Sequence, residues 1–417
     1  MTTPFLAGAV AAGCAAFCPI AQEDAVEGLQ PDPLVAVDGS AVTDAADWKQ
    51  RRRPEILELF RRHMYGRSPP AMELAVGAVE EAAALDGMAR RRQWSLRYGP
   101  EEGATLEVLV YVPAKATGPV PAFLGLNFYG NQSIHPDPGI RMSTRWMRNN
   151  DKFGVVDNRA TERSRGVRLS RWPVEAILER GYGLVAVYYG DIDPDFDDGF
   201  ENGVHGVIDP ASEGERAPDA WGSIAAWAWG LSRVLDSLGP EPTIDARRVA
   251  VVGHSRLGKT SLWAGAQDER FAMVISNNSG CGGAAYSRRR SGETVAKINR
   301  GFPHWFCRAF HGYDEREDDL PIDQHLLISL IAPRPAYVAS ATGDAWADPK
   351  GEFLSTRGAN PVYRLLGTKG LPATTMPEPD TPVQGQLGYH QRTGRHDLTL
   401  FDWQNYMDFA DRHLRRR

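Results

Sequence analysis

The octapeptide from Gly253 to Thr260, Gly-His-Ser-Arg-Leu-Gly-Lys-Thr, constrains this chain more than any other segment. A short apolar run at 248–252 precedes it, and a helix-compatible segment at 261–266 follows it. A strand, a glycine-containing turn and a helix in this order predict an α/β fold with a functional turn at the carboxyl end of a strand. The same residues support two different chemistries.

In the first interpretation the octapeptide is a phosphate-binding loop, because it matches G-x-x-x-x-G-K-T. A nucleotide enzyme also needs a carboxylate for magnesium after an apolar strand. The strand predicted at 271–276 is followed by Asn277 and Asn278, so Asp344, after a later strand, is left for that role. A P-loop nucleotide-binding protein is therefore the weaker alternative.

In the second interpretation Ser255 is a hydrolase nucleophile on a strand-to-helix turn. In α/β hydrolases the triad follows the chain order serine, acid, histidine. Asp344 follows an apolar strand and His396 lies in a loop before the last helix, so this chain has that order. A serine hydroxyl needs an imidazole to take its proton and a carboxylate to orient that imidazole. The sequence therefore predicts a triad of Ser255, His396 and Asp344.

Two basic residues follow the nucleophile in the G-x-S-x-x-G turn. Arg256 comes directly after Ser255, so its backbone N–H, helped by its guanidinium, is predicted to stabilise an oxyanion. Lys259 lies about one helical turn beyond Ser255. It is either a solvated helix residue or a group that binds polar atoms of the substrate.

Strands and helices alternate along the rest of the chain. Strands are predicted at 93–98, 105–112, 121–128, 183–189, 248–252, 271–276 and 336–341, and helices at 44–64, 174–179, 217–238 and 402–413. This alternation predicts a mostly parallel central sheet covered by helices on both faces, a three-layer α/β sandwich. Residues 141–171 read as an inserted loop region, and 191–198 as an acidic loop. Residues 22–417 are predicted to form one catalytic domain.

The first 21 residues are predicted to be a secretory leader, with a disordered terminus as the alternative. Residues 5–17 are apolar but too short to span a bilayer, and no basic residue precedes them. We expect cleavage near Ala21 and a secreted or periplasmic protein. Cys14 and Cys18 fall in this leader, and whether Cys281 pairs with Cys307 is left open.

Composition excludes several classes of partner. Hydrophobic residues make up 42% of the 417 residues and charged residues 24%, as in soluble globular proteins. A net charge of −6 argues against nucleic acid and anionic membranes. The spacing of His and Cys indicates no zinc site, so we expect neither metal nor cofactor. The 11 tryptophans suit a large core or a carbohydrate-facing surface. We expect a monomer.

Residues 253–259 resemble the G-[CH]-S-R-x-G-K signature of carbohydrate esterase family 15, the glucuronoyl esterases. The resemblance covers most of the chain from about residue 30 onward. The other matching segments are Trp48 with 52–56, 65–69, 126–131, 279–284, 292–294, 302–306, 332–335, 344–353 and 396–397.

The resemblance implies an α/β-hydrolase-fold serine esterase that needs no metal. Its substrates would be esters between 4-O-methyl-glucuronate groups of xylan and lignin alcohols, cleaved through an acyl-enzyme. Ser255 would be the nucleophile, His396 the base and Arg256 part of the oxyanion hole. The residues that match glucuronate-contacting positions are Lys259, Glu293 and Trp346. An acetyl-xylan type of carbohydrate esterase and a non-catalytic carbohydrate-binding relative are the alternatives.

Two positions depart from the fungal members of that family. Those members carry the acid in Glu-Ser-Gly, where this chain has Asn278, and an amide cannot balance an imidazolium. The acid is therefore assigned to Asp344, with Asp348 and Asp397 as weaker candidates. His254 occupies the position of a disulfide-forming cysteine, so that disulfide is absent.

Overall fold

One mixed sheet runs through the computed structural model, which describes residues 29–99, 105–209 and 216–415. Its strand order is β1-β3-β4-β8-β5-β9-β10-β11-β13-β12, and β2 pairs with β3 beside this path. The central strands are β8 (Gly183–Tyr188), β5 (Val120–Asn127), β9 (Ile244–His254), β10 (Met273–Asn277), β11 (Ala336–Ala341) and β13 (Leu387–Arg392). Neighbours among these six strands run parallel.

The edges of the sheet are antiparallel. They consist of β1 (Ala75–Val76), β2 (Glu80–Ala84), β3 (Ala89–Arg97), β4 (Thr105–Pro113) and β12 (Val383–Gln384). All residues of β8, β10 and β11 are buried, as expected for parallel strands that are covered on both faces.

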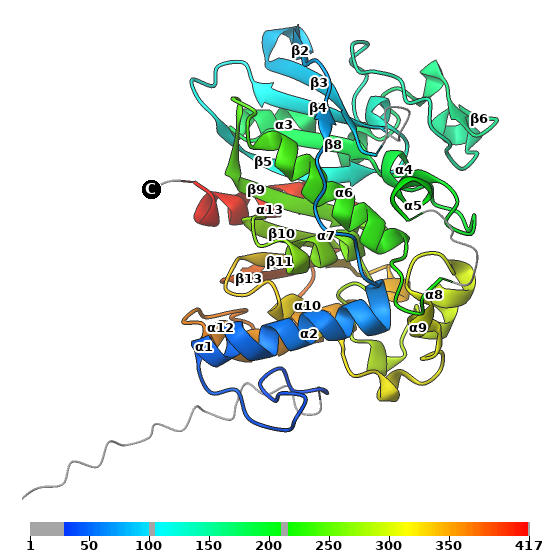
Figure 1. Cartoon of the computed structure of the whole chain (residues 1–417). Coiled ribbons are helices and arrows are strands. Elements are labelled where there is room, and N and C mark those ends of the chain that lie inside the picture. The colour runs from blue at the N-terminus through cyan, green and yellow to red at the C-terminus, as the bar shows by residue number, and fades with distance from the viewer. Residues whose placement is uncertain (1–28, 100–104, 210–215, 416–417) are drawn as a thin grey trace, which may run out of the picture.

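Helices cover both faces of the sheet and enclose two hydrophobic cores. One core includes residues of α2 (Arg53–Phe60), α6 (Ser223–Leu238), α7 (Arg256–Gln267) and α10 (Gln324–Ser329). The other is formed with α3 (Val174–Glu179) and α13 (Leu400–His413). Figure 1 shows α6 and α7 in front of the strands and α13 behind them. The predicted mostly parallel sheet between two helical layers, a three-layer α/β sandwich, is confirmed.

The N-terminal helical segment packs against α7 and the loop beyond β10. It comprises α1 (Ala45–Asp47), a π-helical turn (Trp48–Arg52), α2 and a second π-helical turn (Arg61–Tyr65). At its end, the ring of Tyr65 stacks on Trp263 of α7 with 4.4 Å between ring centroids. The Tyr65 hydroxyl donates to the carbonyl of Gly282, 217 positions later, at 2.8 Å. This residue therefore joins the first helices to a loop beyond β10.

Some elements differ from the sequence-based expectation. Helix α6 begins at Ser223 rather than at 217, because Gly222 is extended and donates its N–H to the carbonyl of Tyr65. Strand β13 was not predicted, since its sequence Leu-Gly-Tyr-His-Gln-Arg has no apolar run. The loop character of 141–171 is confirmed, with only short turns and the pair β6 (Val155–Val156) and β7 (Arg159–Ala160).

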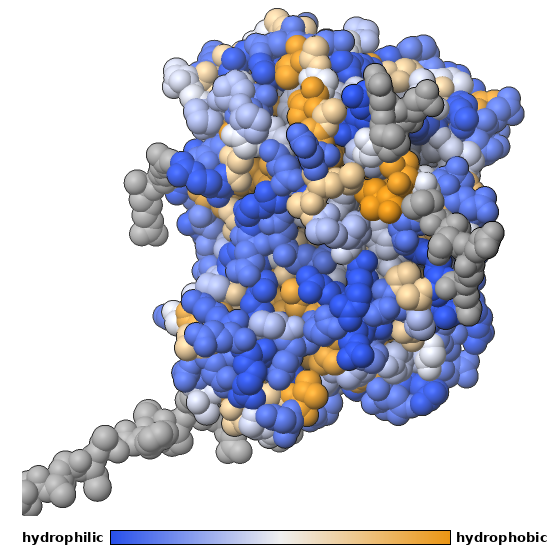
Figure 2. Space-filling model, in the orientation of Figure 1, coloured by the Kyte–Doolittle hydropathy of each residue, from blue (hydrophilic) through white to orange (hydrophobic). Residues whose placement is uncertain are grey.

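The described residues contain no helix long and apolar enough to cross a membrane. The predicted leader, residues 1–21, lies outside the described residues, as do Cys14 and Cys18. Figure 2 shows a predominantly hydrophilic face, on which hydrophobic residues form small separate groups.

Candidate active site

Ser255 lies in a tight turn between β9 and α7. Its backbone has φ 60° and ψ −129°, a conformation that L-residues rarely adopt. A Cβ atom on Gly253 would lie 1.8 Å from the carbonyl oxygen of Leu257, so the turn requires glycine there. The N–H of Ser255 donates to the carbonyl of Asn277 at 2.8 Å, which ties the turn to the end of β10. The serine therefore stands at the carboxyl edge of the sheet.

An acid and a histidine lie beside this serine. Nδ1 of His396, in the loop after β13, is 2.6 Å from Oδ2 of Asp344, which follows β11. Both line a pocket of about 280 Å³ together with Ser255. The Asp344 side chain is 4% exposed, whereas that of His396 is 40% exposed. The structure thus brings together the three residues of the predicted triad.

The carboxyl group of Asp344 is held in its charged form. Burial alone would raise its pKa, but the hydrogen bond and charge of His396 and the amide of Asn278 bring the pKa below its ordinary value. Nδ2 of Asn278 donates to Oδ2 of Asp344 at 2.8 Å. Asn278 is therefore a hydrogen-bonding neighbour of the acid.

The two competing acids face other partners. Asp348 accepts from Nε of Arg289 at 2.8 Å, in the turn that follows Trp346. Asp397 pairs with Arg171. Each of these carboxylates is thus bound to an arginine, which favours Asp344 as the group that orients the histidine.

Arg256 is the first residue of α7. Helix N-terminal N–H groups lack an intrahelical acceptor, so its backbone N–H is available beside Ser255. Its guanidinium pairs with Asp195 and lies over the ring of Trp305, 4.6 Å from the ring centroid. Arg256 therefore presents both a backbone donor and a cation at the nucleophile.

Lys259 lies on the floor of the same pocket and is 3% exposed. Its Nζ donates to the carbonyls of Ser279 and Cys281 at 2.6 and 2.7 Å and to Oε2 of Glu293 at 2.8 Å. The other oxygen of Glu293 accepts from Nε1 of Trp346 at 3.2 Å. The interpretation of Lys259 as a solvated helix residue is therefore wrong.

The hydrogen bonds of Lys259 also argue against the phosphate-loop interpretation. Three acceptors of the protein already use the three N–H bonds of the Lys259 ammonium, so none remains for a nucleotide phosphate.

Cys281 and Cys307 are both buried, free thiols. Burial raises the pKa of each thiol above its ordinary value, to about 11 for Cys307.

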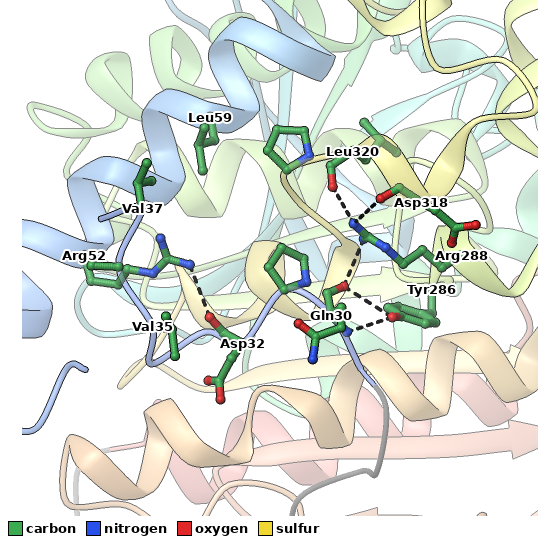
Figure 3. Close-up of a pocket in the computed structure, with 13 residues that line it drawn as sticks. Gln30, Asp32, Val35, Val37, Arg52, Leu59, Tyr286, Arg288, Asp318 and Leu320 are labelled. Atoms are coloured by element: carbon green, nitrogen blue, oxygen red, sulfur yellow. Dashed lines mark hydrogen bonds between the residues drawn. The ribbon is translucent and has the colours of Figure 1, made fainter. Parts of the chain in front are cut away.

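A larger hollow of about 1060 Å³ lies elsewhere, between the N-terminal segment and residues 286–321. Figure 3 shows that Arg52 and Arg288, which line it, bond to backbone carbonyls. These groups hold the chain together and present no nucleophile. Nor do residues 29–99, 105–209 and 216–415 contain a group of three side chains suited to hold a metal ion.

A nucleophilic serine turn and an acid–histidine pair at the carboxyl edge of a parallel sheet define a serine hydrolase of the α/β-hydrolase class. A family model described as glucuronyl esterase from fungi matches residues 216–367. The carbohydrate esterase MZ0003, from an unknown prokaryotic organism, is 52% identical over 386 residues, which cover 92% of this chain and 89% of that protein. The chain belongs to carbohydrate esterase family 15, the glucuronoyl esterases, as its motifs predicted.

Solved structures give the same result. A promiscuous CE15 esterase from a marine bacterial metagenome superposes with a TM-score of 0.87 at 52% identity, over 92% of this chain and 96% of that one. The glucuronoyl esterase from Solibacter usitatus gives a TM-score of 0.85 at 45% identity, over 91% and 97% of the two chains.

Proposed function

We propose that this glucuronoyl esterase hydrolyses the esters that join 4-O-methyl-glucuronate groups of xylan to lignin alcohols. The observation that carries this proposal is the joint position of the Asp344–His396 pair and the Lys259–Glu293–Trp346 group in the pocket that Ser255 lines. The first group supplies the hydrolytic chemistry. The second offers the Glu293 carboxylate, which Lys259 holds in place, and an indole, which suit a sugar ring with hydroxyl groups.

In acylation, Oγ of Ser255 attacks the ester carbonyl while Nε2 of His396 takes its proton. Asp344, bonded to Nδ1, keeps the imidazole in the required tautomer and stabilises its cation. Negative charge develops on the carbonyl oxygen, where the N–H and guanidinium of Arg256 stabilise it. His396 then protonates the leaving alcohol.

In deacylation, His396 removes a proton from water, and the resulting oxygen attacks the acyl carbon of the glucuronoyl–Ser255 ester. The tetrahedral intermediate collapses, and its C–O bond to Ser255 breaks as His396 returns the proton to the serine. The released uronic acid ionises near neutral pH. The partly exposed histidine leaves a path for the alcohol and the water.

Hydrolysis of benzyl glucuronate by wild type and by Ser255→Ala, side by side with acetylated xylan, tests the proposal. We expect turnover of the glucuronate ester that the alanine variant lacks. A clear preference for acetylated xylan would instead favour an acetyl-xylan esterase. A relative from Schizophyllum commune, 28% identical over 350 residues, is a 4-O-methyl-glucuronoyl methylesterase, which supports the first outcome.

We also propose that the mature protein is a secreted or periplasmic monomer. The polymeric plant substrate supports a site of action outside the cytoplasm. On the face that Figure 2 shows, hydrophobic residues form only small separate groups, which supports the monomer. N-terminal sequencing of the exported protein and its mass in solution test the two statements.

A further inference from the structure

The two cationic side chains among the described residues that line the pocket each have a buried carboxylate partner. Lys259 pairs with Glu293, and Arg256 pairs with Asp195. Glu293 lines the pocket itself, whereas Asp195 lies behind Arg256 in the acidic loop after β8. Its side chain is 3% exposed. The triad and the sugar-binding group do not account for this second carboxylate.

Asp195 accepts hydrogen bonds from four side chains. Oδ1 accepts from Nε2 of His304 at 3.0 Å and from Nε1 of Trp305 at 2.7 Å. Oδ2 accepts from the hydroxyl of Tyr189 at 3.0 Å and from Nη1 of Arg256. These donors come from separate parts of the chain, so the direction of the Arg256 guanidinium is fixed from behind.

The carboxyl group of Asp195 is held in its charged form. Burial alone would raise its pKa, but the hydrogen bond from His304, the charge of Arg256 and the hydrogen bond from Trp305 together hold the pKa well below its ordinary value. A charged Asp195 therefore faces the Arg256 cation near neutral pH.

The reaction changes the charge of the group that lies against Arg256. The substrate is a neutral ester, and the product is an anionic uronate. A guanidinium without a partner binds carboxylate through two parallel hydrogen bonds and would hold the product. In the low-dielectric pocket that attraction would be stronger than in water. A guanidinium paired with a carboxylate keeps its other donors for the transient oxyanion, while the ion pair as a whole carries little net charge.

We propose that Asp195 is a positioning and specificity-determining residue: it aims Arg256 at the oxyanion and cancels its charge, so that the site accepts the neutral ester and releases the uronate. This inference rests on the proposed function. It predicts that wild type binds glucuronate and its neutral analogue glucuronamide with similar affinity.

The test compares inhibition of benzyl glucuronate hydrolysis by glucuronate and by glucuronamide. In Asp195→Asn we expect glucuronate to bind at least about ten-fold more tightly than in wild type, and glucuronamide to change less than about two-fold. A loss of packing would weaken both inhibitors alike. Equal changes for the two, or no change for either, would overturn the inference.

Two further variants separate charge from structure. Tyr189→Phe removes one hydrogen bond of Asp195 but keeps its charge, so the ratio of the two inhibition constants should stay at the wild-type value. Asp195→Asn combined with Arg256→Gln should also restore a ratio near that value, measured by calorimetric binding, because the cation is gone. A ratio that still favours glucuronate in this double variant would contradict the role given to Arg256.

If Asp195→Asn does not fold, binding of the two inhibitors to wild type still tests the inference. Glucuronate binding more than about ten-fold tighter than glucuronamide in wild type would show an uncancelled cation. A failure of the proposed function looks different, since wild type would then turn over acetylated xylan but not benzyl glucuronate.

Discussion

The two sides of the active site hold their charges in different ways. On the histidine side, His396 is 40% exposed and depends on a single carboxylate, Asp344. On the other side, the side chains of Lys259, Glu293 and Asp195 are at most 7% exposed, and each has several partners. The side that transfers protons is open to solvent, whereas the side that holds fixed charges is sealed. Substitutions on the first should change turnover, and those on the second should also change stability.

The largest effect is expected from the acid of the open side. Asp344→Asn should lower kcat by about 10⁴-fold, because an amide cannot stabilise the imidazolium. The control is Asp397→Asn, which removes the neighbouring carboxylate that pairs with Arg171 and should cost less than about ten-fold. Initial rates with benzyl glucuronate measure both. Similar kcat values for the two variants would move the acid away from Asp344.

On the sealed side, Lys259→Met should destabilise the fold by about 3–5 kcal/mol, since it leaves Glu293 charged, buried and unpaired. Adding Glu293→Gln should restore much of that loss. Lys297→Met, at an exposed lysine that contacts the carbonyl of Gly292, is the control and should change stability little. Urea unfolding of the four proteins measures these free energies. A Lys259→Met variant as stable as wild type would show that this side is not held by its ion pair.

A third prediction concerns Glu352 of α11 (Pro349–Gly358), which supports the floor of the sealed side. Its Oε1 accepts from the N–H groups of Ser279 and Gly280, and its Oε2 lies 2.6 Å from Oγ of Ser340. Burial raises the pKa of Glu352 to about 7. Because the pKa of Glu352 is higher in the folded than in the unfolded chain, its protonated carboxyl group stabilises the fold fully at pH values below the unfolded-state pKa. This stabilisation is lost as the pH rises through about 7.

Glu352→Gln mimics the protonated carboxyl group at every pH. Between pH 4.5 and 7, wild type should therefore lose on the order of 3 kcal/mol relative to the variant. Melting temperatures of the two proteins across this range measure the difference. Parallel curves would mean that Glu352 is ionised throughout, like the carboxylates that face a cation.

The smallest effect is expected at the rim between the two sides. Trp346 is 53% exposed, and its indole has one hydrogen bond, to Glu293. Trp346→Ala should raise KM by up to about ten-fold through loss of contact with the sugar, with kcat and Tm little changed. Trp346→Phe should recover part of the affinity. A fall in kcat with unchanged KM would place Trp346 among the groups that act on the reacting atoms.

Local patterns were sufficient to predict much of the fold. Strand β11 has the bounds predicted from its apolar run, 336–341, and α13 begins only two residues before its predicted start. In contrast, β13, which leads to His396, was missed. Most of its residues are buried, yet His390, Gln391 and Arg392 are polar and bond to distant partners, as in the Tyr337–His390 hydrogen bond. The hydrophobic periodicity of the sequence does not show such pairing between distant residues.

The same limit applied to the site. The chain order of Ser255, Asp344 and His396 predicted their meeting, and the family motif pointed to Lys259, Glu293 and Trp346. Asp195 was noted only as part of an acidic loop. Its partner Arg256 lies 61 positions away, and no spacing rule links the two. The identity of the residue that neutralises Arg256 depends on the folded backbone.

Tyr65 has a consequence for how the molecule is made. Its hydroxyl binds the carbonyl of Gly282, next to Cys281, whose carbonyl anchors the Lys259 ammonium. The first helices leave the ribosome long before the loop around Gly282 is synthesised. Their apolar surface therefore stays uncovered until some 220 more residues emerge. During translation this early segment therefore keeps apolar surface exposed, and its late docking completes the catalytic floor.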